Sequence, residues 1–208
     1  LHWLLILRSI PGGSSSLDDG DKGAQHFKIV DGSQKLSKLL AEQQNICFDD
    51  ALISVDYTSS SEIALTLLSG RKLTCRYLLL AFAPSLLTRV SFTPPLCFGP
   101  NSQMTMGQCI KTIFIYSIPF WRGVKTSETD EQGPCSNIFD LEKPTALIGL
   151  ILGDEASWWC NREESELVEA ITKQYNALYR VDYKPIQTFI QYWPKEKWIC
   201  TFHSNALH

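Results

Sequence analysis

The sequence predicts an α+β domain in which a mixed, largely antiparallel sheet is flanked by helices. Short segments with alternating polarity recur between turn residues, which is typical of hairpin strands. Two continuous apolar runs, residues 77–82 and 108–116, have the character of buried strands. An amphipathic segment after Asn161 predicts a long helix that packs on the sheet.

Composition and charge exclude several classes of protein. The chain of 208 residues has a net charge of −3 and no basic stripe interleaved with aromatics, so nucleic acid is not an expected partner. Its seven cysteines are odd in number and widely spaced, which favours reduced thiols over a disulfide framework or a zinc site. The four histidines have no partner at metal-ligand spacing, and we expect no metal.

The first half of the chain predicts two helices and several hairpin strands. Ser33 is expected to cap the second helix, and Leu36, Leu39 and Leu40 are expected to form its inner face. Helices are expected at 1–10, 34–44 and, after Pro84, 84–89. Strands are expected at 26–30, 51–58, 63–68, 72–76 and 77–82, with an extended connection at 92–96.

The second half predicts four strands and the longest helix. The strands are expected at 108–116, 137–141, 146–152 and 185–192. The helix begins near Asn161, with Glu164 three residues later as in a capping box. Its apolar stripe consists of Val168, Ile171, Tyr175 and Leu178.

Two polar residues are candidates for a site. Lys111 lies in the middle of an apolar strand, on the same face as Cys109, Ile113 and Ile115, and lysine is rarely buried. One interpretation is an edge strand whose lysine reaches solvent; the other is a lysine that points into a cavity, where it holds a water or meets a cofactor. Gln25 follows Gly23-Ala24 at the start of a strand.

Several motifs, in order, resemble those of the flavin-dependent amine oxidases of the monoamine oxidase type. The stretch from Lys22 to Ser33 resembles the family's Gly-Gly-Ala-Gln segment and the following strand, with Lys22 in place of the first glycine. The strand 77–84 and the segment Phe-Thr-Pro-Pro-Leu at 92–96 also match. The most specific match is Met-Gly-Gln-Cys-Ile-Lys at 106–111, followed by Pro-Phe-Trp-Arg at 119–122.

This resemblance implies which part of the family's fold the chain covers. Residues 23–200 would form the substrate-binding domain, with minor flavin-domain segments near 46–96. Residues 1–22 would be a helix end and loop from a preceding region, and residues 201–208 a truncated end. We therefore expect a piece of a longer protein, whose FAD this piece alone is not expected to bind.

The resemblance also implies roles for six residues. Lys111 would hold a water against the flavin, and Gln25, Asn137 and Leu150 would line the substrate cavity. Leu52 would meet the FAD adenine through its main chain, and Trp193 would lie near the flavin. The family's cavity tyrosine is Asn137 here, and Cys200 lacks the glycines and tyrosine that surround the family's flavin-linked cysteine, so no covalent link is expected.

The implied activity is oxidative deamination of primary or other small amines to aldehyde, ammonia and hydrogen peroxide, with oxygen as co-substrate. Two alternatives stay open: a relative that acts on polyamines or amino acids, and an inactive fragment that acts at most as a binding module. The resemblance implies an intracellular location, with the mitochondrial outer membrane among the family's locations. This chain has no counterpart of the anchoring helix of the vertebrate enzymes, and no oligomeric state is implied.

Overall fold

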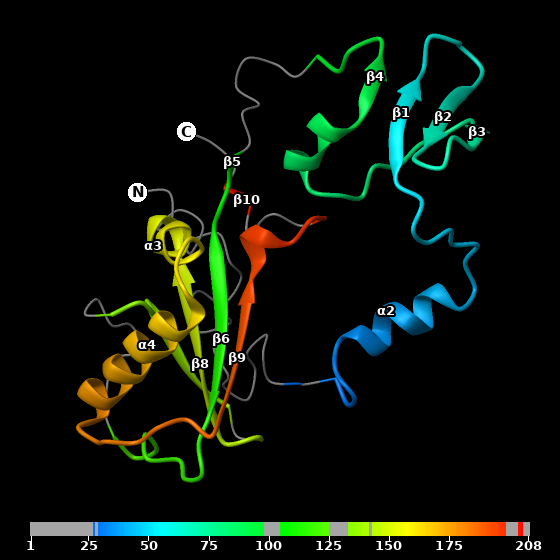
Figure 1. Ribbon diagram of the computed structural model, residues 1–208. Coiled ribbons are helices and arrows are strands. Elements are labelled where there is room, and N and C mark those ends of the chain that lie inside the picture. The colour runs from blue at the N-terminus through cyan, green and yellow to red at the C-terminus, as the bar shows by residue number, and fades with distance from the viewer. Residues whose placement is uncertain are drawn as a thin grey trace, which may run out of the picture. The chain divides into compact units, whose positions relative to one another are not determined.

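The chain divides into two compact units, Leu1–Ala51 and Leu52–His208. The structure is a computed structural model (Figure 1). It describes residues 27, 29–97, 105–124, 133–141, 143–198 and 204–205. The expected helix at 1–10 and most of the expected strand at 26–30 lie outside these residues, and so does Gln25.

The described part of the first unit contains one helix, α2 (Gln34–Ala41). The expected helix is confirmed, but the expected cap is wrong because the Ser33 side chain makes no capping hydrogen bond. Lys35 instead pairs with Asp31 at 2.7 Å, one turn earlier. The expected inner face is also wrong, since no residue of this helix is buried and Leu36, Leu39 and Leu40 are exposed. An apolar stripe forms an inner face only where another layer covers it.

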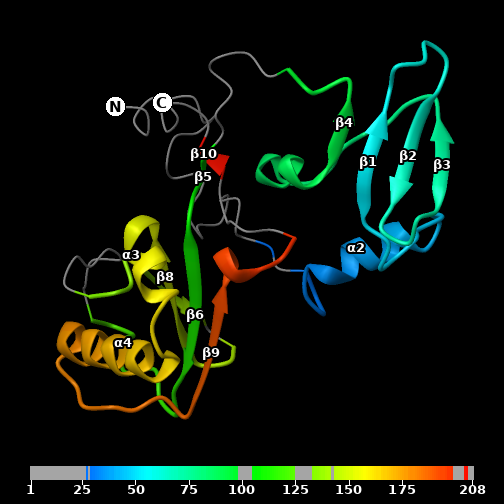
Figure 2. The same cartoon turned by 45° about the horizontal axis from the view of Figure 1, so that its top comes forward.

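The second unit begins with a four-stranded sheet in the order β3-β2-β1-β4. Figure 2 shows β2 between β1 and β3. The two hairpins are antiparallel as expected, whereas β4 runs parallel to β1. The strands are β1 (Leu52–Asp56), β2 (Ile63–Leu67), β3 (Lys72–Cys75) and β4 (Ser91–Thr93).

The expected buried strand at 77–82 is wrong. These residues form no strand in the structure, and Tyr77 and Leu79 are 91% and 89% exposed. An apolar run indicates a preference for burial, but a strand also needs a neighbour with which to share backbone hydrogen bonds, and none of the described strands pairs with it. The expected helix after Pro84 is confirmed as a short 3-10 helix, η2 (Pro84–Arg89).

The second sheet has the order β7-β8-β6-β9, and all its strands are antiparallel. Figure 1 shows β6 between β8 and β9. The strands are β6 (Cys109–Ile115), β7 (Asn137–Leu141), β8 (Ala146–Leu152) and β9 (Gln187–Tyr192), which confirms all four expected strands. A two-residue pairing joins β5 (Thr105–Met106) to β10 (Ser204–Asn205). With the helices described below, the sheets confirm the α+β class.

Two helices cover one face of this sheet, α3 (Gly153–Trp159) and α4 (Glu164–Tyr179). The fully buried side chains Ile110 and Phe114 of β6 meet Leu167, Ile171 and Tyr175 of α4 in the core. Burial of this kind contributes roughly 1.5–3 kcal/mol for each large apolar side chain. The helix α3, which sequence patterning missed, is too short to show a clear apolar period.

The expected start of α4 is wrong by two residues. Its N-cap is Glu163 rather than Asn161, and no side chain caps it. Asn161 instead donates from its side-chain amide to the Ser157 carbonyl at 3.0 Å, because α3 ends just before it. The carboxylates of Glu164 and Glu166 lie in the first turn of α4, where the helix dipole favours negative charge.

Candidate functional site

Lys111 lies at the centre of β6 and faces away from the helices. Its neighbours Ile110 and Thr112 are fully buried on the helix-covered face, whereas Lys111 itself is half-buried on the other, which we call the open face. The strand β6 lies between β8 and β9, so the edge-strand interpretation of this lysine is wrong. The ammonium therefore projects from the middle of the sheet.

Three of the expected site residues form one row across the open face. Lys111 pairs with Leu150 on β8, and Leu150 pairs with Asn137 on β7. Gln191 on β9 completes the row as the other partner of Lys111. Residues directly opposite each other in antiparallel strands share a face, and neighbouring strands lie about 4.8 Å apart. Asn137 and Lys111 are therefore about 10 Å apart across two strand spacings.

The adjacent row on the open face is apolar. Ile113 pairs with Ile148 on one side and with Phe189 on the other, and Ile148 pairs with Phe139. Phe139 and Phe189 are 38% and 50% exposed, so this row offers a broad apolar surface. Strand alternation leaves Lys111 as the one charged residue of β6, β7, β8 and β9 on this face. An apolar wall with a single ammonium can hold a flat ring and a water at its polar edge.

Of the other expected site residues that the structure describes, Trp193 lies close to this row and Leu52 lies in the first sheet. Trp193 begins the 3-10 helix η3 (Trp193–Lys195), which follows β9 directly and contacts β6. Leu52 lies in β1, in the first sheet, beyond the β1–β4 pairing that starts at Ser54. On the side that faces β4, the main chain of Leu52 therefore lies outside the paired residues of the two strands.

Cys109, two residues before Lys111, is fully buried. Burial raises the pKa of its thiol from 9.0 to about 11, and the positive charge of Lys111 opposes that rise. The thiol is therefore neutral at physiological pH and unsuited to act as a nucleophile. Lys111 is the group in this part of β6 that carries charge.

Behind the row, a buried polar cluster joins the sheet to α4. The side-chain amide of Gln174 accepts from the Cys135 N–H at 2.9 Å and donates to the Cys135 carbonyl at 2.8 Å. The Thr112 hydroxyl donates to the Gly149 carbonyl, and the Tyr175 hydroxyl lies 3.7 Å from the Cys135 sulfur. These contacts fix the chain two residues before Asn137. Sequence patterning missed Gln174 because a glutamine inside a helix carries no signal of its own.

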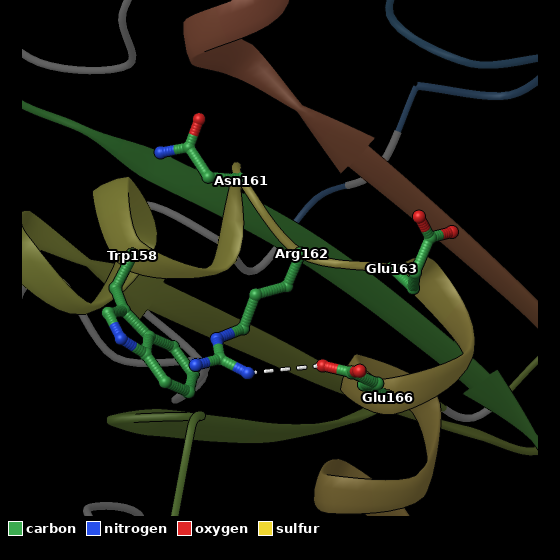
Figure 3. A pocket seen from close by; sticks show the side chains of 5 residues that line it. All are labelled: Trp158, Asn161, Arg162, Glu163 and Glu166. Carbon is green, nitrogen blue, oxygen red and sulfur yellow. Dashed lines mark hydrogen bonds and ion pairs between the residues drawn. The ribbon is translucent and has the colours of Figure 1, made fainter.

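A surface depression of about 460 Å³ lies at the turn between α3 and α4, apart from the open-face row (Figure 3). The Arg162 guanidinium stacks 3.6 Å from the centre of the Trp158 ring and donates to Glu166 at 3.2 Å. Arg162 thus occupies this depression with its own stacking and ion pair. None of the expected site residues lines it.

Known proteins resemble this chain in sequence along most of its length. The family model of flavin-containing amine oxidoreductases matches residues 14–206. The chain belongs to this family. A probable flavin-containing monoamine oxidase A of Dictyostelium discoideum is 27% identical over 84% of this chain and 41% of that relative. Flavin-containing amine oxidase B of Homo sapiens is 26% identical over 83% of this chain and 36% of that protein.

Solved structures of flavin amine oxidases share the fold. Putrescine oxidase bound to putrescine superposes with a TM-score of 0.71 and 19% identity over 84% of this chain and 41% of that chain. Cyclohexylamine oxidase from Brevibacterium oxydans superposes with a TM-score of 0.69 and 18% identity over 82% of this chain and 40% of that chain. This chain thus spans about two fifths of the length of the relatives it matches. Family membership implies FAD as the cofactor of the full-length parent protein.

The described residues give two further findings on this chain. No helix among them is long and apolar enough to cross a membrane. They also contain no group of three or more histidine, cysteine or acidic side chains placed to hold a metal ion.

Proposed function

We propose that this chain forms the substrate side of an FAD-dependent amine oxidase, which converts small primary or other small amines to aldehyde, ammonia and hydrogen peroxide. The observation that carries the proposal is the row in which Lys111, Leu150 and Asn137 share one face of the sheet. Lys111 is unusual in its strand on chemical grounds, the family resemblance assigns Leu150 and Asn137, and the three lie on three different strands. Their arrangement in one row supports a common site.

The residues of the open face fit the family's cofactor. When bound, FAD supplies the oxidising chemistry by accepting a hydride equivalent from the carbon next to the amine. Lys111 carries three N–H donors and no acceptor, so it holds a water by donating to it. The surrounding apolar side chains exclude other water and favour the neutral amine over its protonated form.

The other row residues shape the slot for the substrate. Leu150 supplies apolar surface next to Lys111, and Asn137 places an amide about 10 Å away from it. The family resemblance implies a role in substrate binding for Gln25 as well. Leu52 would contribute only main-chain groups to the adenine end, and Trp193 an aromatic ring near the flavin. We assign residues 23–200 to the substrate-binding domain, with minor flavin-domain segments near 46–96.

The polyamine and amino-acid alternatives require charged recognition groups. A polyamine oxidase would place carboxylates in the cavity to meet a second ammonium, and an amino-acid oxidase would place an arginine to meet the substrate carboxylate. None of the strand residues on the open face of β6, β7, β8 or β9 is acidic or an arginine, and the nearby carboxylate of Glu196 is engaged by the Gln191 amide. This supports the monoamine activity over both alternatives.

The proposal is tested with the purified chain and with a longer version of the protein that contains the rest of the family's fold and binds FAD. We call this longer protein the flavin-loaded version. The first measurement is visible absorbance of bound flavin, and the second is peroxide formation with a series of primary amines, diamines and amino acids. We expect the flavin-loaded version to release peroxide fastest with monoamines. Flavin absorbance without peroxide from any amine would favour the inactive binding module instead.

A further inference from the structure

Gln191 lies directly beside Lys111, on the side opposite to Leu150. The two residues are paired in the antiparallel register of β6 and β9, so their side chains emerge from the same face. The Gln191 side-chain nitrogen donates to a carboxylate oxygen of Glu196 at 2.7 Å. Glu196 directly follows η3, and its backbone N–H donates to the Trp193 carbonyl. The short turn after β9 thus brings a carboxylate to the amide next to Lys111.

The chemistry of this contact fixes the direction of the amide. An ionised carboxylate only accepts hydrogen bonds, so the Gln191 amide presents its NH₂ group to Glu196. Its carbonyl oxygen is then left as an acceptor. The Lys111 ammonium has donors only, and Leu150, its other partner in the row, has no side-chain acceptor. Among the row residues next to Lys111, Gln191 therefore carries the one side-chain acceptor.

Electrostatics favour the same arrangement. Lys111 is half-buried on an apolar face, and the open-face residues of the four strands include no carboxylate that could balance its charge. A partly buried charge is stabilised by a counter-charge even when a polar group lies between the two. Glu196 supplies such a charge through the amide of Gln191.

We propose that Gln191 is a positioning residue for Lys111: its amide oxygen is the acceptor available beside the ammonium, while Glu196 fixes the orientation of the amide. This proposal gains its catalytic meaning from the proposed function, in which Lys111 holds a water. Gln191 then limits the positions that the ammonium can take on the open face, and so sets where that water is held.

A double-mutant cycle on this chain tests the arrangement of Lys111, Gln191 and Glu196 without any cofactor. Urea unfolding is measured for Lys111→Met, Glu196→Gln and the double variant, first with Gln191 in place and then with Gln191→Leu. With Gln191 present, we expect the two substitutions to be coupled by roughly twofold to fivefold in the unfolding equilibrium constant. With Gln191→Leu, the coupling should fall to a factor of about one within error.

Gln187 provides the matched control, because it lies on the same strand and face but pairs with Ile115, at the other end of β6. Gln187→Leu should leave the coupling between Lys111 and Glu196 intact. Coupling that is absent from the parent chain, or that survives Gln191→Leu undiminished, would overturn the proposal.

Side-chain amide NMR keeps the proposal testable if Gln191→Leu fails to fold. Lys111→Met and Glu196→Gln should each shift the Gln191 amide resonances and leave those of Gln187 in place. Unmoved Gln191 resonances in the Lys111→Met variant would contradict this arrangement. Failure of the proposed function is a separate outcome, since it would appear as unchanged kinetics of Lys111→Met in a flavin-loaded version, whatever the NMR result.

Discussion

Lys111 and Asn137 lie in the same row of the second sheet, two strands apart and on the same face, with Leu150 between them. The opposite face of the same strands packs on α4. This division gives the sheet two roles: one face stabilises the fold, and the other presents a row of side chains for chemistry.

Gly149 is expected to tolerate no side chain. A Cβ atom there would lie 2.4 Å from the Cys135 sulfur, 2.6 Å from the Tyr175 hydroxyl and 2.7 Å from the Thr112 hydroxyl. Gly149→Ala should lower the free energy of unfolding by about 2 kcal/mol or more, because a packed core cannot absorb the added methyl group. Urea unfolding measures the change. The neighbouring Ile148→Val on the open face is the control, with an expected loss of about 1 kcal/mol; equal losses would contradict this account.

Gln174 is expected to stabilise the fold through its two bonds to the Cys135 backbone. Gln174→Ala leaves a buried N–H and a buried carbonyl without these partners, and should cost about 2–3 kcal/mol in the free energy of unfolding. Lys173→Ala, one residue earlier on the exposed side of α4, is the control and should leave stability nearly unchanged. Similar unfolding midpoints for the two variants would show that the bonds between Gln174 and the Cys135 backbone add no stability.

Cys109 should make the chain less stable at high pH. Its pKa is about 11 in the folded chain against 9.0 when unperturbed, so folding favours the neutral thiol. The stability from this group is full below pH 9 and is lost as the pH rises toward 11, by on the order of 1–2 kcal/mol. Unfolding measured across this range should show a shallower decline for Cys109→Ala than for the parent chain. Burial also raises the pKa of Tyr175, but this residue contributes equally to the parent chain and to the variant. Parallel curves for the two proteins would show that Cys109 is not the cause of the decline.

Asn137 is expected to tune which amines fit the slot. The family carries a tyrosine at the matching position, and a phenol offers more apolar surface than an amide. In a flavin-loaded version, Asn137→Tyr should raise kcat/KM for aromatic amines relative to short aliphatic amines by about tenfold. Gln187→Leu, on the same face but at the far end of β9, is the control for a general disturbance of the open face. A ratio that stays at the parent value would remove Asn137 from the substrate surface.

The second sheet was well predicted because its two central strands, β6 and β8, carry largely apolar runs. The bounds of β7 and β8 match the expected residues, and alternation alone placed Lys111 on the face opposite to Ile110 and Thr112. The expected strand at 77–82 failed because hydrophobicity reports burial but not the presence of a pairing neighbour.

The candidate site was only partly predictable. Lys111 is chemically unusual in its strand, whereas Gln191 and Gln174 are ordinary polar residues in sequence. Their importance depends on cross-strand register and on side-chain bonds to distant backbone atoms. Such relationships arise only in the folded chain, so no local pattern indicates them.

The most direct measurement for the central claim is the kinetics of Lys111→Met in a flavin-loaded version of the protein. Stopped-flow absorbance follows flavin reduction by an amine and reoxidation by oxygen separately, with Lys143→Met at an exposed turn as the control. If Lys111 holds the water beside the cofactor, one of the two rates should fall by at least about tenfold while FAD stays bound. Rates equal to those of Lys143→Met in both half-reactions would contradict the claim that the open face is the substrate side of an oxidase site.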